Sequence, residues 1–260
     1  MELPSLAGYT GSDYYNGVFG SGKTRNYSYL YQMSRYTSLW TAYPLTASHT
    51  TGNAATSKWS YNSQIADKTK QINVIDNSYG SNYGNDTYSR GHQIPAADRK
   101  SSDAMNAQTY LVTNQTPQIQ NSFNGVMWSN LENAVRSLTS STDTVYVVTG
   151  AAFQKVGGSE NITYLTAAKT EVYPKSIPVP NYYWKVLLKV KRNSSTGSIT
   201  SASAIGFWAP HVANPSAYTS YACSVAQIEQ FTGFDFFVNL PSSLKSAAKS
   251  NSSWTTFQNF

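Results

Sequence analysis

Apolar and aromatic residues recur along the chain in five short runs, alternating or β-rich in the way that is typical of strands. Residues 193–197 (NSSTG) separate the last two runs and have the composition of a turn, so these runs predict a β-hairpin. In the third run, which contains VYVVTG, we expect Gly150 to end the strand. The five runs are Tyr27–Met33, Leu39–Leu45, Thr144–Phe153, Tyr182–Lys191 and Ile199–Trp208.

Helical periodicity is rarer than strand periodicity in this chain. The clearest pattern covers Phe123–Leu138, where apolar residues recur at steps of three and four. A second helix is predicted to begin at Ser224 and stop at Gly233, and a third follows Pro241. Strands mixed with a few helices in no regular alternation predict an α+β fold, with a mixed, mainly antiparallel central β-sheet flanked by helices.

The chain shows no internal repeat and no Pro-, Gly- or Ser-rich linker that would divide it. Residues 1–26 are rich in Gly, Ser and Tyr and predict a flexible lead-in. The remainder, residues 27–260, is long enough for one large domain, and we expect a single one.

The polar part of the composition is unusual, because only 12% of the residues are charged while Ser, Thr and Asn are abundant and 20 tyrosines are present. That neutral, aromatic profile suits an all-β or α+β protein that works outside the cytoplasm. The single cysteine, Cys223, excludes an intrachain disulfide framework and a multi-cysteine metal site. We expect its thiol to be buried near the start of a helix.

The formal net charge of +6 gives a mild attraction to polyanions, but Lys and Arg are not gathered in one run, so charge alone does not establish nucleic-acid binding. No apolar stretch approaches the length of a transmembrane helix, so we expect no membrane insertion. The first residues, MELPSLAGYTG, lack a basic start followed by an apolar run, and we expect that an export signal has been removed.

Two segments combine residue types that can carry chemistry. The first, residues 88–100 (YSRGHQIPAADRK), contains His92; taken alone, a histidine in such a segment is usually a polar surface or structural residue. In the second, residues 113–136, four residues on the predicted helix are spaced four apart: Asn124, Trp128, Glu132 and Arg136. At about 100° per residue they form a strip beside the apolar face. Taken alone, this strip is a solvated face with one weak ion pair.

Taken together and in order, SRGHQIPAADR, NQTPQ and FNGVMWSNLE resemble the motif series of the DNA/RNA non-specific endonucleases. This family of the ββα-metal, or His-Me finger, class includes secreted bacterial nucleases and is related to mitochondrial endonuclease G. The segments LWTAYPL, VYVVTGAAF, IPVPNYYWKVLLKV and EQFTGFDFFVNLP extend the resemblance over most of the chain, from residue 27 to residue 245. The resemblance implies a ββα-metal catalytic motif within the α+β domain, which makes residues 27–260 a single nuclease domain.

The resemblance also implies a role for each matching residue. His92 matches the general base and Asn124 the one direct protein ligand of a divalent metal ion, while Glu132 matches a carboxylate that holds metal-bound waters. Three further residues complete the implied catalytic set. Arg90 matches the arginine two residues before the base, Asn114 matches a further active-site asparagine, and Arg136 matches an arginine that faces the phosphate. The chain departs from the family at Ser89, where the family usually has Asp, and we expect this change to tune the site without inactivating it.

The chemistry of phosphodiester hydrolysis suits these residue types. A neutral imidazole can remove a proton from the attacking water. A hard cation such as Mg²⁺ takes oxygen ligands and keeps several waters, and we expect Mn²⁺ or another divalent cation to substitute for it. Arginines supply planar donors to phosphate oxygens. Because none of these groups reads base edges, we expect cleavage of DNA and RNA with little sequence preference, leaving 5′-phosphate ends as the resemblance implies.

Two alternative functions stay open at the level of sequence. One is a non-catalytic module that binds polyanions or glycans, and the other is a degenerate nuclease that binds nucleic acid without cutting it. The presence of His92, Asn124 and Glu132 together favours an enzyme over both. Family members are often dimers, so the resemblance allows a homodimer, but the sequence leaves the oligomeric state open. A bound inhibitor protein would likewise leave no trace in the sequence.

The remaining histidines and acidic residues receive structural interpretations. His49 lies in a Ser- and Thr-rich segment and is expected to be exposed to solvent, whereas His211 is expected to be structural. Asp98 is expected to brace the segment after Pro95 and to form a local ion pair with Arg99.

Overall fold

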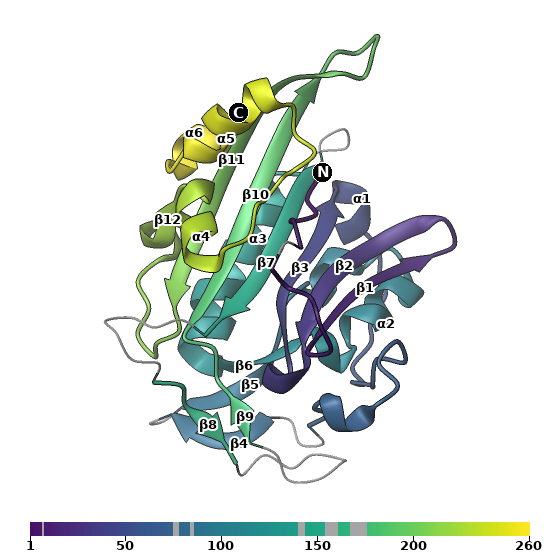
Figure 1. The fold of residues 1–260 in the computed structure, drawn as a ribbon, viewed down its shortest axis with the longest axis vertical. Coiled ribbons are helices and arrows are strands. Elements are labelled where there is room, and N and C mark those ends of the chain that lie inside the picture. The colour runs from purple at the N-terminus through teal and green to yellow at the C-terminus, as the bar shows by residue number, and fades with distance from the viewer. Residues whose placement is uncertain (7, 75–77, 84–85, 140–143, 154–160, 167–175) are drawn as a thin grey trace.

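The computed structural model describes residues 1–6, 8–74, 78–83, 86–139, 144–153, 161–166 and 176–260 (Figure 1). Its centre is a seven-stranded sheet in the order β1-β2-β3-β7-β10-β11-β12. All the strand pairs of this sheet are antiparallel. The strands are β1 (Tyr14–Ser21), β2 (Thr24–Gln32), β3 (Thr37–Leu45), β7 (Val145–Ala152), β10 (Tyr182–Arg192), β11 (Ile199–Pro210) and β12 (Ala222–Cys223).

The five strands predicted from apolar patterning correspond to β2, β3, β7, β10 and β11 and are confirmed. The central strands read as nearly continuous apolar runs because both faces of the sheet are covered and side chains on both sides are buried. The predicted hairpin joins β10 to β11. Its turn is closed by the Asn193 side chain, which accepts hydrogen bonds from the backbone N–H groups of Ser195 and Thr196.

The structure differs from the sequence expectation over residues 1–26, where a flexible lead-in was predicted. Residues 14–21 form β1, which pairs with β2 along its length and is the first strand of the sheet. The pattern misses this strand because it lies at the sheet edge and buries little; Val18, for example, is 53% exposed. Gly17 fits there because a side chain at that position would overlap the ring of Tyr29 on the neighbouring strand.

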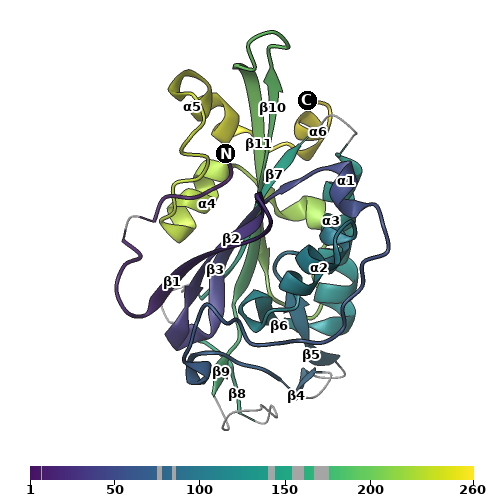
Figure 2. The same ribbon diagram turned by 90° about the vertical axis from the view of Figure 1, so that its right-hand side faces the viewer.

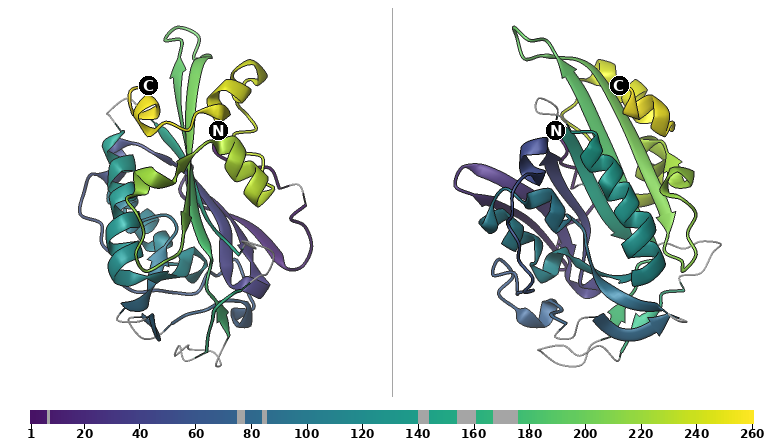
Figure 3. Two further views of the ribbon diagram at one scale, coloured as in Figure 1. Left: turned by 90° about the vertical axis from the view of Figure 1, so that its left-hand side faces the viewer. Right: turned by 180° about the vertical axis from the view of Figure 1, so that it is seen from behind.

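Helices cover both faces of the central sheet (Figures 2 and 3). On one face lie α1, α2, α3 and α6, and α3 and α6 contribute Leu131, Val135, Trp254 and Phe257 to the apolar core there. On the other face α4 and α5 cover a second core. The helices are α1 (Ala47–Thr50), α2 (Asp103–Thr109), α3 (Ser129–Ser137), α4 (Val225–Thr232), α5 (Ser242–Ser250) and α6 (Trp254–Gln258).

The helix predicted from Ser224 is α4: the Ser224 side chain caps its first turn and Gly233 ends it with a left-handed backbone, as expected. The helix predicted after Pro241 is α5. Cys223 precedes α4 and is partly buried, in line with its predicted position.

A smaller antiparallel sheet, in the order β4-β5-β6, lies beside the α3 face. Strand β6 leads directly into a π-helical segment, η5 (Gln120–Trp128), which continues into α3. Strands β5 and β6 and this helix form a ββα unit, which confirms the predicted α+β fold class. The strands of this sheet are β4 (Ser78–Tyr83), β5 (Asp86–His92) and β6 (Gln115–Ile119).

The remaining elements are short. Strands β8 (Tyr164–Leu165) and β9 (Ile177–Pro178) pair with each other. Turns of 3-10 helix occur at η1 (Met33–Arg35), η2 (Lys68–Lys70), η3 (Ala96–Arg99), η4 (Val112–Asn114) and η6 (Tyr218–Tyr221). None of the helices in the described part of the chain combines the length and the apolar character needed to cross a bilayer.

Gly150 does not end its strand, contrary to the sequence expectation. Strand β7 continues to Ala152, and Gly150 pairs with Trp184 on β10. A side chain at position 150 would overlap the indole of Trp184 and the backbone carbonyl of Leu39. The glycine is therefore required by close packing inside the strand.

This close approach generates a stability prediction. Gly150→Ala should lower the free energy of unfolding by about 1–3 kcal/mol or more, because the added methyl group overpacks a rigid part of the core. Urea denaturation followed by circular dichroism measures the change. A midpoint equal to that of the wild-type protein would contradict the packing described at this glycine.

Candidate active site

His92 lies at the end of β5, where its ring packs between two aromatic side chains. The ring centroids of Trp59 and Tyr110 are 4.6 Å and 4.7 Å from that of His92. Burial, and then the positive charge of Arg90, lower the pKa of His92 from 6.5 to about 4. The imidazole is therefore neutral at physiological pH, and its Nε2 atom has no hydrogen-bond partner among the described residues.

Arg90 precedes His92 by two positions on the same strand and is partly buried. Its guanidinium lies 5.9 Å from the ring centroid of Trp59, and Nη1 is 3.5 Å from the backbone oxygen of Val74. These contacts are weak, since a distance of 3.5 Å is at the limit of a hydrogen bond. Within the described ranges these are the hydrogen-bonding and cation–π contacts of the guanidinium, while its charge acts on His92.

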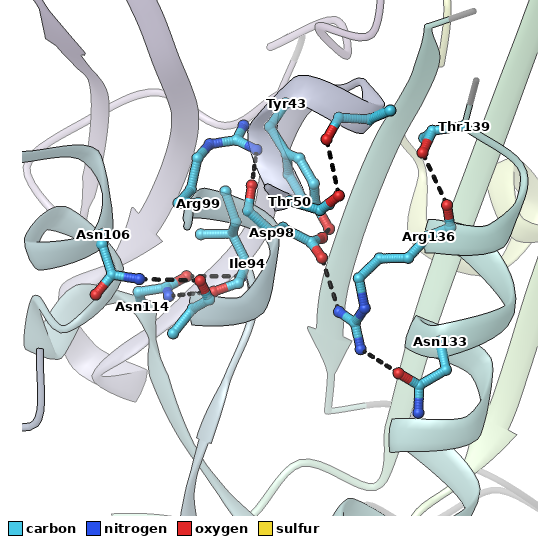
Figure 4. Close-up of polar contacts among 12 residues, drawn as sticks. Tyr43, Thr50, Ile94, Asp98, Arg99, Asn106, Asn114, Asn133, Arg136 and Thr139 are labelled. Carbon is cyan, nitrogen blue, oxygen red and sulfur yellow. Dashed lines mark hydrogen bonds and ion pairs between the residues drawn. The ribbon is translucent and has the colours of Figure 1, made fainter. Parts of the chain in front are cut away.

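Asn114 holds Ile94, which follows His92 by two positions (Figure 4). The residue is 1% exposed. Its Oδ1 accepts a hydrogen bond from Ile94 N at 3.0 Å, and its Nδ2 donates to the backbone oxygens of Ile94 and Thr109 at 3.0 Å and 2.8 Å. Because these bonds use both its donor and its acceptor atoms, this geometry positions the segment after His92.

Asn124 lies in η5, opposite β5. Its Nδ2 donates hydrogen bonds to Ser89 Oγ at 3.0 Å and to Gln120 Oε1 at 3.2 Å. Ser89 Oγ in turn donates to the backbone oxygen of Gln118 at 3.0 Å. The amide is thereby oriented by its nitrogen, and its Oδ1 accepts no hydrogen bond from any residue that the structure describes.

The helix bearing Asn124 is not a uniform α-helix, and this changes the predicted strip of side chains. In η5 the backbone N–H of Ser129 bonds to the carbonyl of Asn124, five residues earlier, so the rotation per residue is smaller than in an α-helix. Trp128 is consequently buried against Phe123 and Tyr183, at 5.7 Å and 5.9 Å between ring centroids. The predicted strip is therefore wrong at Trp128, which belongs to the core.

Arg136, in the last turn of α3, binds Asp98 in the segment after His92 (Figure 4). Its Nη1 is 2.7 Å from Asp98 Oδ1, and the Tyr43 hydroxyl donates to Asp98 Oδ2 at 2.9 Å. The other edge of the guanidinium donates to Asn133 Oδ1 at 2.8 Å. Arg136 thus ties α3 to the segment after His92.

The predicted ion pair between Asp98 and Arg99 is wrong. Arg99 Nη1 donates to the backbone oxygen of Asp98, and the rest of the guanidinium is bound by Asn26 and by the carbonyl of Pro44. The carboxylate of Asp98 points instead to Arg136 and Tyr43. Asp98 does brace the segment after Pro95, as predicted.

Glu132 lies one turn before Arg136 and is partly buried. No described residue forms a hydrogen bond or an ion pair with its carboxylate. Burial raises the pKa of Glu132, while the ammonium of Lys185 opposes that rise. Sequence reasoning missed Lys185, although a charged residue inside the apolar run YYWKVLLKV was a signal that could have found it.

The structure brings some of the predicted site residues together and leaves others apart. Ser89 joins β5 to Asn124, and Asp98 joins the segment after His92 to Arg136. Among the described residues, no hydrogen bond or ion pair links His92 to Asn124 or to Glu132. Likewise, no three His, Cys, Asp or Glu side chains in the described ranges gather into a metal site.

The other histidines are structural. His211 Nε2 accepts a hydrogen bond from Ile119 N at 2.9 Å, and its Nδ1 lies 3.0 Å from the backbone oxygen of Pro180, which confirms the structural prediction. His49 is half-buried, contrary to the expected exposure, because its ring completes a capping box with Thr46 at the start of α1.

The fold and the site together define the class: a ββα unit that carries a histidine at the end of a strand and an amide on the following helix, set against an antiparallel sheet. Sequence comparison gives the family. A sequence model of the DNA/RNA non-specific endonucleases matches residues 11–243, so the chain belongs to this family of hydrolases.

Individual relatives agree with this assignment. The protein "Nuclease 1, mitochondrial" of Schizosaccharomyces pombe is 30% identical over 165 residues, which are 61% of this chain and 49% of that protein. A nuclease of a Nostoc species is 25% identical over 233 residues, which are 86% of this chain and 75% of that protein. The chain thus spans about half the length of the yeast relative.

A solved structure agrees at the level of the fold. The structure of the EndoG/EndoGI complex matches with a TM-score of 0.63, covers 89% of each chain and is 20% identical in sequence. A match over this share of the chain supports the fold independently of the short motifs.

The buried histidines generate a prediction about acid stability. Burial lowers the pKa of His211 from 6.5 to about 4. Below pH 6.5 His211 binds a proton in the unfolded chain but stays neutral in the folded protein. Its contribution to the free energy of unfolding is therefore full above pH 6.5 and falls as the pH drops toward 4. Between pH 7 and pH 5, His211 alone should remove about 2 kcal/mol of stability.

Urea denaturation at pH 7, 6 and 5 measures this loss. The variant His211→Gln should be less stable than the wild-type protein at pH 7, because it loses buried contacts, but its stability should depend less steeply on pH. Equal pH dependence in the two proteins would show that His211 is not held neutral by the fold.

Proposed function

We propose that this chain is a Mg²⁺-dependent, sugar-non-specific endonuclease that hydrolyses phosphodiester bonds in DNA and RNA and leaves 5′-phosphate ends. Membership of the nuclease family supports the reaction class. The observation that carries the proposal is the amide of Asn124, whose nitrogen is fixed by Ser89 and Gln120 while its oxygen accepts no hydrogen bond from a described residue. A binding module without catalysis would have no need of an amide oriented in this way.

The donor atoms of the site fit a hard divalent cation. Mg²⁺ prefers oxygen ligands and retains several waters, so a site with one direct protein ligand is adequate. Asn124 Oδ1 and the carboxylate of Glu132 are two oxygen donors that no described residue occupies. When bound, the cation would stabilise charge on the phosphate and make its waters more acidic. In this proposal Asn124 is the direct ligand, Glu132 holds waters of the ion, and Mn²⁺ or another divalent cation can replace Mg²⁺.

His92 acts as the general base. Its lowered pKa keeps the imidazole neutral, so one ring nitrogen can accept the proton of the attacking water. The water oxygen then bonds to phosphorus as the bond to the 3′ oxygen breaks, which leaves the phosphate on the 5′ side. Trp59 and Tyr110 hold the ring from two sides and limit its rotation.

Three further residues have different roles in this proposal: Arg90, Arg136 and Asn114. Arg90 has donors that no described residue binds, and they are suited to phosphate oxygens. Arg136 is shared between Asp98 and any phosphate, so positioning of α3 is part of its role. Asn114 acts through the segment after His92 and not on substrate. Since contacts of this kind go to the backbone and not to base edges, little sequence preference follows.

The partners and the location are proposed from the composition and from the family resemblance. DNA and RNA are the substrates. A homodimer and an exported site of action, secreted, periplasmic or at the cell surface of a bacterium, are the working expectations. They are supported by the charge-poor, Tyr-rich composition and by the resemblance to secreted nucleases. The relatives include one named as a mitochondrial nuclease and one from a Nostoc species.

The role of His92 can be tested directly. His92→Ala should lower the cleavage rate by about 10²–10⁴-fold, the usual contribution of a general base, while the fold is kept. Plasmid DNA and total RNA are incubated with Mg²⁺ or with EDTA, and cutting is followed over time. His49→Gln is the matched control, since glutamine preserves the capping box and should leave cutting unchanged. Near-wild-type cutting by His92→Ala would remove His92 from the mechanism.

A change at Ser89 tests whether Asn124 is the metal ligand, because Ser89 helps to orient the Asn124 amide. Ser89→Ala removes one of the two acceptors that orient the Asn124 amide, and should raise the Mg²⁺ concentration for half-maximal cutting by about 10- to 100-fold. Ser137→Ala is the control, because that exposed hydroxyl only bonds back to its own helix. An unchanged Mg²⁺ requirement in Ser89→Ala would mean that Asn124 is not the ligand.

A further inference from the structure

Lys185 is a buried cation without a hydrogen-bonding partner. It lies in the middle of β10 and is 1% exposed. Its Nζ forms no hydrogen bond with any described residue, and no described carboxylate lies within ion-pair distance. An unpaired charge in an apolar interior is costly. A negatively charged group near Lys185 would offset this cost.

The surroundings of Lys185 limit which anion this can be. In the sheet its neighbours across β7 and β3 are Thr149 and Thr41, which are uncharged. On the helix side, Nζ lies 5.1 Å from the ring centroid of Trp128, close enough for a cation–π contact. Glu132 follows Trp128 by one helical turn, so its side chain emerges on the same side of the helix.

The other charges of this region are already matched. Asp98 uses one oxygen to bind Arg136 at 2.7 Å and the other to accept the Tyr43 hydroxyl at 2.9 Å. The Arg99 guanidinium is taken up by Asn26 and backbone carbonyls. With Asp98 and Arg136 paired, the carboxylate of Glu132 and the ammonium of Lys185 are the charges in this region that no described residue matches.

We propose that Lys185 is the counter-charge of Glu132 and a positioning residue for it: the ammonium under Trp128 fixes where the carboxylate stands on the catalytic helix. The electrostatics agree, since the positive charge of Lys185 opposes the rise of the Glu132 pKa and the negative charge of Glu132 opposes the fall of the Lys185 pKa. The consequence for catalysis rests on the proposed function, whereas the pairing itself does not.

A stability cycle tests the pairing without any measurement of activity. Lys185→Met and Glu132→Gln should each lower the melting temperature by roughly 5–15 °C, because each leaves the opposite charge without its partner. The double variant should return to within about 3 °C of the wild-type protein, because no unpaired charge is left. Additive losses in the double variant would overturn the pairing.

Lys249 offers a matched control. It is also a buried lysine, but it lies in α5 on the other side of the sheet and pairs with Glu229 and Asp235. Lys249→Met should lower the melting temperature equally in the wild-type and Glu132→Gln backgrounds. If Lys185→Met alone does not fold, recovery of folded protein on adding Glu132→Gln supports the pair, and failure of the double variant to fold contradicts it.

Kinetics on a short DNA duplex then tests the positioning role. Lys185→Met should lower kcat by more than about 10-fold with little change in KM, because Glu132 is displaced while substrate contacts are kept. Coupled stabilities with an unchanged kcat would confirm the pair and overturn the positioning role. Absence of cutting by the wild-type protein would overturn the proposed function and this role with it, while the melting temperatures would still decide the pairing.

Discussion

The carboxylate of Asp98 connects three elements that the site depends on. It is 2% exposed, follows His92 in η3, and binds Arg136 of α3 and the hydroxyl of Tyr43 on β3. A buried carboxylate without such partners would be strongly destabilising. The fold therefore requires these bonds, and they fix α3 relative to the central sheet and to the segment that follows His92. Asn114 adds a second restraint on the same segment from the opposite side.

Burial acts in different directions on the two groups that would handle protons and metal-bound waters. It lowers the pKa of His92, so that the ring stays neutral and able to accept a proton. It raises the pKa of Glu132, which works against the charged form. The same desolvation thus prepares the base and opposes the carboxylate. A positive charge beside the carboxylate, as at Lys185, is the simplest way to satisfy both requirements in one dry site.

The sequence predicted the central sheet well because strands buried on both faces leave long apolar runs. It failed at β5 and β6, whose sequences, DTYSRGH and QTPQI, are largely polar. Three polar residues of β6 are nonetheless buried, because this strand contacts both η5 and β3 of the central sheet: Gln115, Thr116 and Gln118. Strands of this kind are created by tertiary packing and carry no periodic apolar signal.

The candidate site shows the same division. Motif resemblance selected His92, Asn124 and Glu132 as candidates, but it could not predict contacts between distant positions. The link between Arg136 and Asp98 spans 38 positions, and a pattern of neighbours suggested Arg99 in its place. The π-helical turn likewise moved Trp128 into the core, since a wider turn breaks the rule of about 100° per residue.

The serine at position 89 gives this site its particular character. Its hydroxyl accepts from Asn124 and donates to the carbonyl of Gln118, a combination that an ionised aspartate could not provide. The hydroxyl therefore keeps the amide oriented and also satisfies β6, but it contributes no negative charge beside a cation. If Asn124 and Glu132 hold a cation as proposed, Glu132 would supply the negative charge beside it that Ser89 lacks, so the position and ionisation of Glu132 would then be decisive.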